Sequence, residues 1–206
     1  MPTLPLEETL NLSEITIKYG LNSYRYGSSS FLSDLFDPIE ITSETVFYDL
    51  GSGYGNIILY GAVKHPDVQF KGIEILEERN KVCVALIEKE GLANARAISG
   101  DILKADISDG NVFYLYNPLY DFQYAELLEK LYHISLRKNI IVIADECHRT
   151  QSGKLHRVMK ALLPDAVFIG FTGTPLLKKD KATSLEVFGG YIHTYKFSEG
   201  VEDKVV

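Results

Sequence analysis

Residues 46–55 read Val-Phe-Tyr-Asp-Leu-Gly-Ser-Gly-Tyr-Gly, an apolar run that ends in a carboxylate and three glycines at every second position. The apolar part predicts a buried strand. The glycines predict a tight turn, because a residue without a Cβ lets the backbone turn sharply and lets a ligand approach it closely. Residues 56–64 then predict a helix that begins directly at the turn. This order is typical of open α/β sheets, whose ligands bind beyond the carboxyl ends of the strands.

The same alternation of strands and helices continues outward from this stretch. Several apolar runs lack a period of two, which indicates parallel strands that are covered on both faces. Gly91 falls just past one predicted helix, where a glycine commonly ends a helix. We therefore predict an α/β fold with a parallel sheet and helices on both faces. The predicted strands are residues 46–50, 68–75, 95–99, 112–116 and 139–144, and the predicted helices are residues 56–64, 77–90 and 120–133.

The net charge of −7 is concentrated in the first two thirds of the 206 residues. Residues 1–138 hold 12 Lys and Arg against 20 Asp and Glu, whereas residues 139–206 hold 9 against 8. An acidic first part argues against a broad electrostatic grip on nucleic acid by that part. No apolar run reaches the roughly 18 residues of a membrane span, and the start of the chain lacks a secretory signal pattern, so no membrane partner is expected. Cys83 and Cys147 have no metal-ligand spacing, and we expect reduced thiols in a cytoplasmic protein without a metal site.

The glycine spacing separates the cofactors that such a turn can hold. A dinucleotide site requires the pattern Gly-x-Gly-x-x-Gly, but Asn56 occupies the position of the last glycine. A phosphate-binding P-loop needs Gly-Lys-Ser/Thr, which occurs nowhere in the sequence. The carboxylate of Asp49 would repel a phosphate, whereas it suits a ligand that carries an ammonium group.

The segment from Asp49 to Gly55 resembles motif I of the class I S-adenosyl-L-methionine-dependent methyltransferases. The resemblance implies a Rossmann-like fold and S-adenosyl-L-methionine as the cofactor. It also implies that Asp49 helps to hold the methionine part, and that Gly51, Gly53 and Gly55 leave backbone room for the ribose and sulfonium region. The alternative is a glycine-rich turn without a ligand.

Two further acids fall where this cofactor would need them. Glu74 ends a predicted strand 19 residues after Gly55, close to the spacing at which a carboxylate chelates a ribose diol. The alternative is a solvated side chain at a strand end. Asp101 follows the third predicted strand and resembles the acid of the family's adenine site, which accepts a hydrogen bond from the exocyclic amine. The alternative for Asp101 is a helix cap.

The substrate side is indicated by Asn117-Pro118-Leu119-Tyr120, directly after the fourth predicted strand. This segment is similar to the Asn-Pro-Pro-Tyr/Phe motif of enzymes that methylate exocyclic amines. It departs from that motif at Leu119, and no DNA-target domain is recognisable, so a nucleic-acid base is not the expected substrate. We take Asn117 and Tyr120 as candidate catalytic residues that contact the substrate; the alternative is a simple turn at the end of the strand.

Residues 47–56 and 72–75 most resemble the disruptor-of-telomeric-silencing type lysine methyltransferases and their small bacterial relatives, over about residues 20–135. The resemblance implies an in-line transfer of a methyl group from a sulfonium to an amine. The methyl acceptor would then be a protein lysine, and the enzyme would mainly position the reactants.

A second signature begins near residue 135. Residues 139–151 (NIIVIADECHRTQ) and 168–175 (FIGFTGTP) resemble helicase motifs II and III of the motor subunit of type I restriction enzymes. In a working motor, the residues matching Asp145 and Glu146 hold magnesium and orient the attacking water. Those matching Thr172 and Thr174 couple the nucleotide site to DNA movement. The sequence has no P-loop lysine, and we expect no second motor lobe, so we expect no ATPase activity from this chain alone.

We therefore expect three parts: a helical lead-in at residues 1–45, a methyltransferase-like Rossmann domain at residues 46–138, and a helicase-like fragment at residues 139–206. The last part is expected either to be irregular or to complete the sheet. Three functions stay open at this point. The first is a methyltransferase whose acceptor is unknown, with protein as one candidate. The second is an incomplete DNA translocase whose partners are DNA or restriction subunits, and the third is a non-catalytic remnant of a gene fusion.

Overall fold

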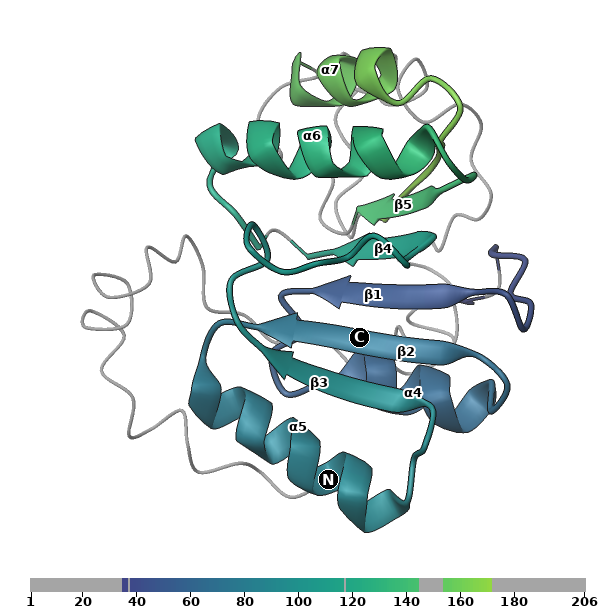
Figure 1. The fold of residues 1–206 in the computed structure, drawn as a ribbon, viewed down its shortest axis with the longest axis vertical. Coiled ribbons are helices and arrows are strands. Elements are labelled where there is room, and N and C mark those ends of the chain that lie inside the picture. Colours follow the sequence, from purple (N-terminus) through teal and green to yellow (C-terminus); the bar gives the residue numbers. More distant parts are fainter. Residues whose placement is uncertain (1–34, 37, 117, 145–153, 172–206) are drawn as a thin grey trace, which may run out of the picture.

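The computed structural model describes residues 35–36, 38–116, 118–144 and 154–171 of the chain. Its helices and strands are labelled as in Figure 1. In chain order they are β1 (Val46–Leu50), α4 (Asn56–Lys64), β2 (Gln69–Glu74), α5 (Glu77–Glu90), β3 (Ala95–Ser99), β4 (Val112–Leu115), the 3-10 helix η2 (Asp121–Gln123), α6 (Tyr124–Ser135), β5 (Ile141–Ala144), α7 (Lys154–Leu162) and β6 (Val167–Gly170).

The strands form one sheet in the order β3-β2-β1-β4-β5-β6, and every neighbouring pair is parallel. The sequence prediction of a Rossmann-like parallel sheet is therefore confirmed. The order reverses between β1 and β4, so the glycine turn after β1 lies where open α/β sheets bind their ligands. Gly91 ends α5 in the left-handed conformation, as its position past the helix predicted.

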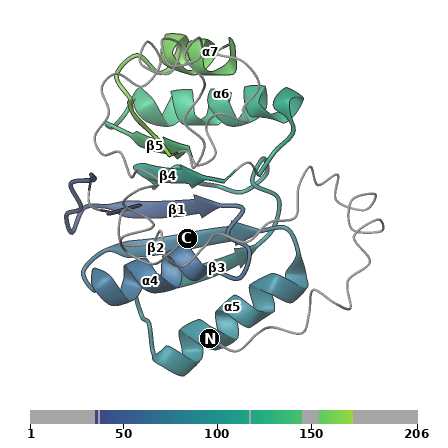
Figure 2. The same cartoon turned by 180° about the vertical axis from the view of Figure 1, so that it is seen from behind.

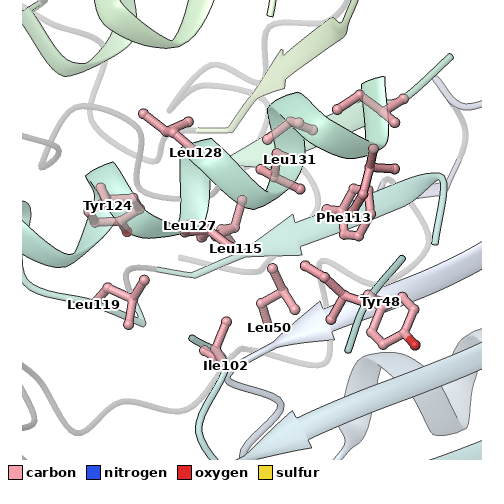
Figure 3. Packing of buried hydrophobic residues seen from close by; sticks show 14 of the residues in the cluster. Tyr48, Leu50, Ile102, Phe113, Leu115, Leu119, Tyr124, Leu127, Leu128 and Leu131 are labelled. Atoms are coloured by element: carbon pink, nitrogen blue, oxygen red, sulfur yellow. The ribbon is translucent and has the colours of Figure 1, made fainter. Parts of the chain in front are cut away.

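Alternate residues of each strand point to opposite faces, and each face is covered by its own helices. One cluster joins Tyr48 and Leu50 of β1 to α6 and α7. Figure 3 shows Leu127 of α6 beside Leu115 of β4, with Leu50 on the neighbouring strand. The other cluster joins Phe47 of β1 to α4 and to Cys83 of α5. Figure 2 views the sheet from behind and brings α4 to the front. The two apolar clusters make a three-layer sandwich, and Asp49 falls on the face of α4 and α5.

The helicase-like part supplies two strands of this sheet. Strand β5 pairs with β4 through residues 141–144, and β6 pairs with β5 and forms the edge of the sheet. Met159 and Leu163 join the same apolar cluster as α6. The last part was expected either to be irregular or to complete the sheet. Its described residues, 139–144 and 154–171, continue the sheet. Residues 140–143 are all β-branched and mostly buried, and such a run fits a parallel interior strand in either family.

Within the described parts of the chain, no helix has the length and apolar character that crossing a bilayer requires. Nor do His, Cys, Asp and Glu side chains of those parts gather into a set that could hold a metal ion.

Candidate cofactor site

The glycine turn between β1 and α4 has a left-handed residue at every second position. Gly51, Gly53 and Gly55 have φ angles of 94°, 56° and 82°, a region that residues with a side chain rarely adopt. The amides of Gly51 and Ser52 both donate to the carbonyl of Ile73 on β2, at 2.9 and 3.0 Å. These hydrogen bonds fix the turn against the end of β2. The alternating glycines are therefore required by the path of the backbone itself.

The three glycines differ in what lies beside them. A Cβ on Gly55 would lie 2.1 Å from the Sγ atom of Cys83, and one on Gly51 would lie 2.8 Å from the Cβ atom of Pro118. A Cβ on Gly53 would meet only the guanidinium of Arg79, at 3.8 Å. Gly51 and Gly55 thus allow close packing of protein on protein. Gly53 is the position at which a ligand can approach the backbone.

Asp49 lies at the end of β1 with only 2% of its surface exposed. In the sheet register it stands between Gly72 of β2 and Tyr114 of β4. Burial raises the pKa of the Asp49 carboxyl to about 8, and the negative charge of Glu74 adds to this rise. A carboxyl that is kept protonated by its surroundings ionises readily when a cation arrives beside it. This position therefore favours a positively charged ligand.

Glu74 ends β2 on the same face and is also buried. One of its carboxylate oxygens accepts the amide of Gly53 at 2.8 Å, and the other accepts the amide of Leu76 at 2.9 Å. The side chain thus joins the glycine turn to the start of α5. A carboxylate has about four acceptor sites, so these two bonds leave capacity for a diol. The solvated strand end that the sequence left open is not what the structure shows.

Residues from four elements line a small hollow beside Asp49. They come from the glycine turn (51–54), the first turn of α4 (Asn56 and Ile57), α5 (Arg79) and the end of β4 (Tyr114 and Tyr116). The hollow measures about 50 Å³, whereas sites that enclose a whole drug-sized ligand measure roughly 300–1,000 Å³. It can thus enclose a small charged end of a ligand. A buried acid, an approachable glycine and a second acid with acceptor capacity are compatible with S-adenosyl-L-methionine.

The other predicted site residues are only partly described. Asp101 accepts the amide of Leu103 at 2.9 Å, and its carbonyl accepts the amides of Lys104 and Ala105. These hydrogen bonds close a turn at residues 101–105 and not the first turn of a helix, so the helix cap that the sequence left open is not formed. A role of Asp101 at the adenine stays a prediction. The Tyr120 ring stacks on Phe122 at 5.8 Å, and the Phe122 side chain is 79% exposed.

Five predicted residues lie outside the described parts of the chain. They are Asn117 of the substrate motif and Asp145, Glu146, Thr172 and Thr174 of the helicase-like motifs.

Sequence reasoning missed Arg79, Tyr114 and Tyr116, all of which line the hollow. The two tyrosines could have been noticed, because β1 and β4 are parallel and end at the same edge of the sheet, with Tyr114 paired to Asp49. For Arg79 no such signal exists, since a basic residue in the first turn of a charged helix is usually solvated.

Two family models match the chain. The second of the two regions begins earlier in the sequence than the helicase-like motifs do. The model described as SWI2/SNF2 ATPase matches residues 71–206, about two thirds of the chain. The chain belongs to the SWI2/SNF2 ATPase family. The model described as histone methylation protein DOT1 matches residues 18–95. The two matches overlap at residues 71–95 and meet within one sheet, so this SWI2/SNF2 chain carries a methyltransferase-like first half.

Curated relatives of this SWI2/SNF2 chain are endonuclease subunits of type I restriction enzymes. The HindI subunit of Haemophilus influenzae is 48% identical over 79 residues, which cover 32% of this chain and 7% of that protein. The putative MjaIXP subunit of Methanocaldococcus jannaschii is 44% identical over 70 residues, which cover 34% of this chain and 7% of that protein. The chain thus spans a small part of the length of the relatives that it matches. The sequence resemblance to both families is confirmed.

Solved structures similar to the chain include an RNA methyltransferase of Salinibacter ruber in complex with S-adenosyl-L-homocysteine. That structure has a TM-score of 0.46 and 27% sequence identity, and the match covers 52% of this chain and 71% of that one.

Proposed function

We propose that the chain binds S-adenosyl-L-methionine at the carboxyl ends of β1 and β2 and transfers its methyl group to an amine. The observation that carries the proposal is Asp49, a buried carboxyl beside a glycine turn. A ligand with a sulfonium and an ammonium group would supply the positive charge that this acid lacks. A polyphosphate would instead add negative charge next to Asp49 and Glu74.

Each site residue then has a specific task. Asp49 holds the ammonium end, Gly53 lets the ligand approach the turn, and Glu74 accepts the ribose hydroxyls. Asp101 accepts the adenine amine beside its bond to the amide of Leu103. When bound, the cofactor supplies an electrophilic methyl group, and this chain supplies position and shelter from water.

We assign the methyl acceptor to the side of β4, where Asn117 and Tyr120 would orient an amine. A protein lysine is the proposed acceptor, and the match of residues 18–95 to the histone methylation protein DOT1 supports it. The test is transfer of a tritiated methyl group to a library of lysine-containing peptides, with the same peptides acetylated on lysine as a control. Transfer to the acetylated set alone would contradict a lysine acceptor.

The SWI2/SNF2 membership supports a second candidate, an incomplete DNA translocase that works with DNA or with restriction subunits. Its motor residues would be Asp145, Glu146, Thr172 and Thr174. The sequence has no P-loop lysine to hold the β- and γ-phosphates, which argues against ATP hydrolysis by this chain. A non-catalytic fusion remnant is the third candidate.

Isothermal titration calorimetry separates these candidates. The full chain is titrated with S-adenosyl-L-methionine and, separately, with magnesium-ATP. We expect micromolar binding of the first ligand and no heat from the second. Binding of magnesium-ATP alone would support the translocase. The absence of binding heat with both ligands would support the non-catalytic remnant.

The pH dependence of this binding follows from the raised pKa of Asp49, which is about 8. At pH 6 the free protein keeps this carboxyl protonated, and the cation must displace the proton as it binds. We expect the affinity to rise by up to about tenfold per pH unit from pH 6 and to level off near pH 8. Titration in two buffers of different ionisation enthalpy also measures the released proton. A flat profile with no proton release would contradict contact between Asp49 and the cation.

A further inference from the structure

An aromatic side chain is exposed shortly after the end of β4. Phe122 lies in η2, and 79% of its surface is accessible to water. Its ring stacks on the ring of Tyr120, with the ring centres 5.8 Å apart and the ring planes 9° from parallel. Covering Phe122 would remove a large apolar area from water, so a partner that packs on this ring would gain binding free energy.

The turn that carries Phe122 is closed by two hydrogen bonds. The amide of Tyr120 donates to the Oε1 atom of Gln123 at 3.0 Å, and the amide of Gln123 donates to the carbonyl of Tyr120 at 2.9 Å. These reciprocal bonds hold residues 120–123 in one conformation. The two stacked rings are therefore arranged before a partner arrives, which lowers the entropy cost of binding.

Two carboxylates continue this surface along α6. The 3-10 helix η2 leads directly into α6, so residues 122, 126 and 129 follow at helical spacings of four and three and lie on one side. Glu126 and Glu129 are both exposed, and neither forms an ion pair within the described parts of the chain. We call Phe122, Glu126 and Glu129 the α6 surface. The buried residues of α6 lie on its other side, against the sheet: Tyr124, Leu127, Leu128, Leu131 and Ile134.

An aromatic ring beside two carboxylates favours a flat cation. A guanidinium stacks on an aromatic face and can pair with a carboxylate through its edge at the same time. The wider charge has the same sign, because residues 1–138 hold 12 Lys and Arg against 20 Asp and Glu. A basic partner is attracted by this field, whereas the phosphates of a nucleic acid are repelled.

The α6 surface begins at the edge of the sheet that carries the candidate site. Figure 1 shows that α6 starts near the edge at which β1 and β4 end, and that it runs back along the sheet. The acceptor amine is proposed at the same edge, beside β4. A segment bound on the α6 surface can therefore adjoin the acceptor in the substrate.

We propose that the α6 surface docks a basic, arginine-containing segment of the methyl-accepting protein, with a guanidinium stacked on Phe122 and paired with Glu126 or Glu129. The inference rests on the proposed function, and it names the part of the substrate that flanks the acceptor lysine. Phe122 is then a specificity-determining residue for the substrate and takes no part in cofactor binding.

The experiment measures fluorescence anisotropy of two labelled peptides with the full chain at low salt. Both peptides are glycine-rich and contain one lysine; the first has two flanking arginines, and the second has citrulline in their place, which keeps the shape without the charge. We expect the wild type to bind the arginine peptide about tenfold more tightly. This preference should shrink at high salt, because exposed charges are screened.

Variants of the α6 surface should reduce this preference. In Phe122→Ala, we expect the affinity for the arginine peptide to fall about three- to tenfold, and Phe122→Tyr should restore it because the ring is kept. In Glu126→Gln/Glu129→Gln, we expect a fall of about fivefold for the arginine peptide and of less than about twofold for the citrulline peptide.

Two control variants match these changes elsewhere on the surface. Val63→Ala shortens an apolar side chain that is 66% exposed on α4, which covers the other face of the sheet. Glu88→Gln removes an exposed carboxylate of α5. Both should bind the two peptides as the wild type does.

Each contrary outcome overturns a stated part of the proposal. Equal affinity of the wild type for both peptides, or an unchanged preference in Phe122→Ala, would overturn the inference. Tighter binding of a labelled single-stranded RNA, lost in Phe122→Ala, would do so as well, because the ring would then stack on a base.

Calorimetry with S-adenosyl-L-methionine keeps this inference apart from the proposed function. Phe122→Ala should bind the cofactor as tightly as the wild type. A wild type that binds the cofactor but does not distinguish the peptides would contradict the inference alone. A wild type that does not bind the cofactor would contradict the proposed function, and with it the role of the α6 surface in methyl transfer.

Discussion

In Asp49→Asn, the affinity for S-adenosyl-L-methionine is expected to fall by about 10- to 100-fold at pH 7. Loss of one partner of a buried charge pair costs about 2–5 kcal/mol. Part of this is offset at pH 7, because the wild-type carboxyl, with its pKa of about 8, must first give up a proton. The difference between variant and wild type should therefore widen from pH 7 to pH 8.

The same substitution should leave the stability of the ligand-free protein almost unchanged. An amide has nearly the size of a carboxyl and is neutral, as the buried carboxyl of Asp49 mostly is at pH 7. The thermal midpoint should stay within about 3 °C of the wild type, which corresponds to less than about 1 kcal/mol for a domain of this size. A loss of affinity in a variant of unchanged stability would then report on the ligand and not on the fold.

Asp67→Asn is the matched control, because Asp67 is an exposed carboxylate that precedes β2 at the opposite end of the sheet. It removes the same charge and should not alter binding. S-adenosyl-L-homocysteine, which lacks the sulfonium charge, divides the effect further. A similar loss for both ligands would place Asp49 at the ammonium group. If Asp49→Asn binds the ligand with wild-type affinity, Asp49 does not bind the cationic part of the ligand at the end of β1.

The glycine turn and the sheet could be predicted because local sequence determines them. Residues 46–50 are too apolar for a surface strand, and alternating glycines permit left-handed φ angles at residues 51, 53 and 55. The positions of Asp49 and Glu74 on one face follow from the period of two along parallel strands. These predictions needed only pattern and spacing.

The contents of the hollow could not be predicted in the same way. Arg79 reaches it because α5 packs with Arg79 and Cys83 toward the turn, and the rotation of a helix about its axis is decided by tertiary packing. The sequence of α5 offers little guidance, since its charged residues leave several faces nearly equivalent. The position of residues 167–170 could not be predicted for the same reason. Their sequence is compatible with a strand, but only tertiary packing places that strand next to β5 at the edge of the sheet.

Gly55→Ala is expected to lower the free energy of unfolding by about 3 kcal/mol, the largest stability effect of any single methyl group added to the turn. Two costs combine at this position. A side chain at a φ of +82° is strained by about 1–2 kcal/mol. The new Cβ would also lie 2.1 Å from the Sγ atom of Cys83, so that either α5 or the turn must shift, at about 1–3 kcal/mol. Urea denaturation measures the sum.

Gly91→Ala and Cys83→Ala separate the two costs. Gly91 has a similar φ of +65° but nothing within 4 Å of its Cβ position, so Gly91→Ala should cost only the backbone strain, about 1 kcal/mol. Cys83→Ala removes the clashing sulfur, and the double variant Gly55→Ala/Cys83→Ala should be more stable than the sum of the single effects allows, by about 1 kcal/mol or more. Strict additivity would mean that α5 does not press on the turn. The geometry that holds Arg79 beside the hollow would then need another cause, because Cys83 lies one helical turn beyond Arg79 on α5 and fixes how closely that helix approaches Gly55.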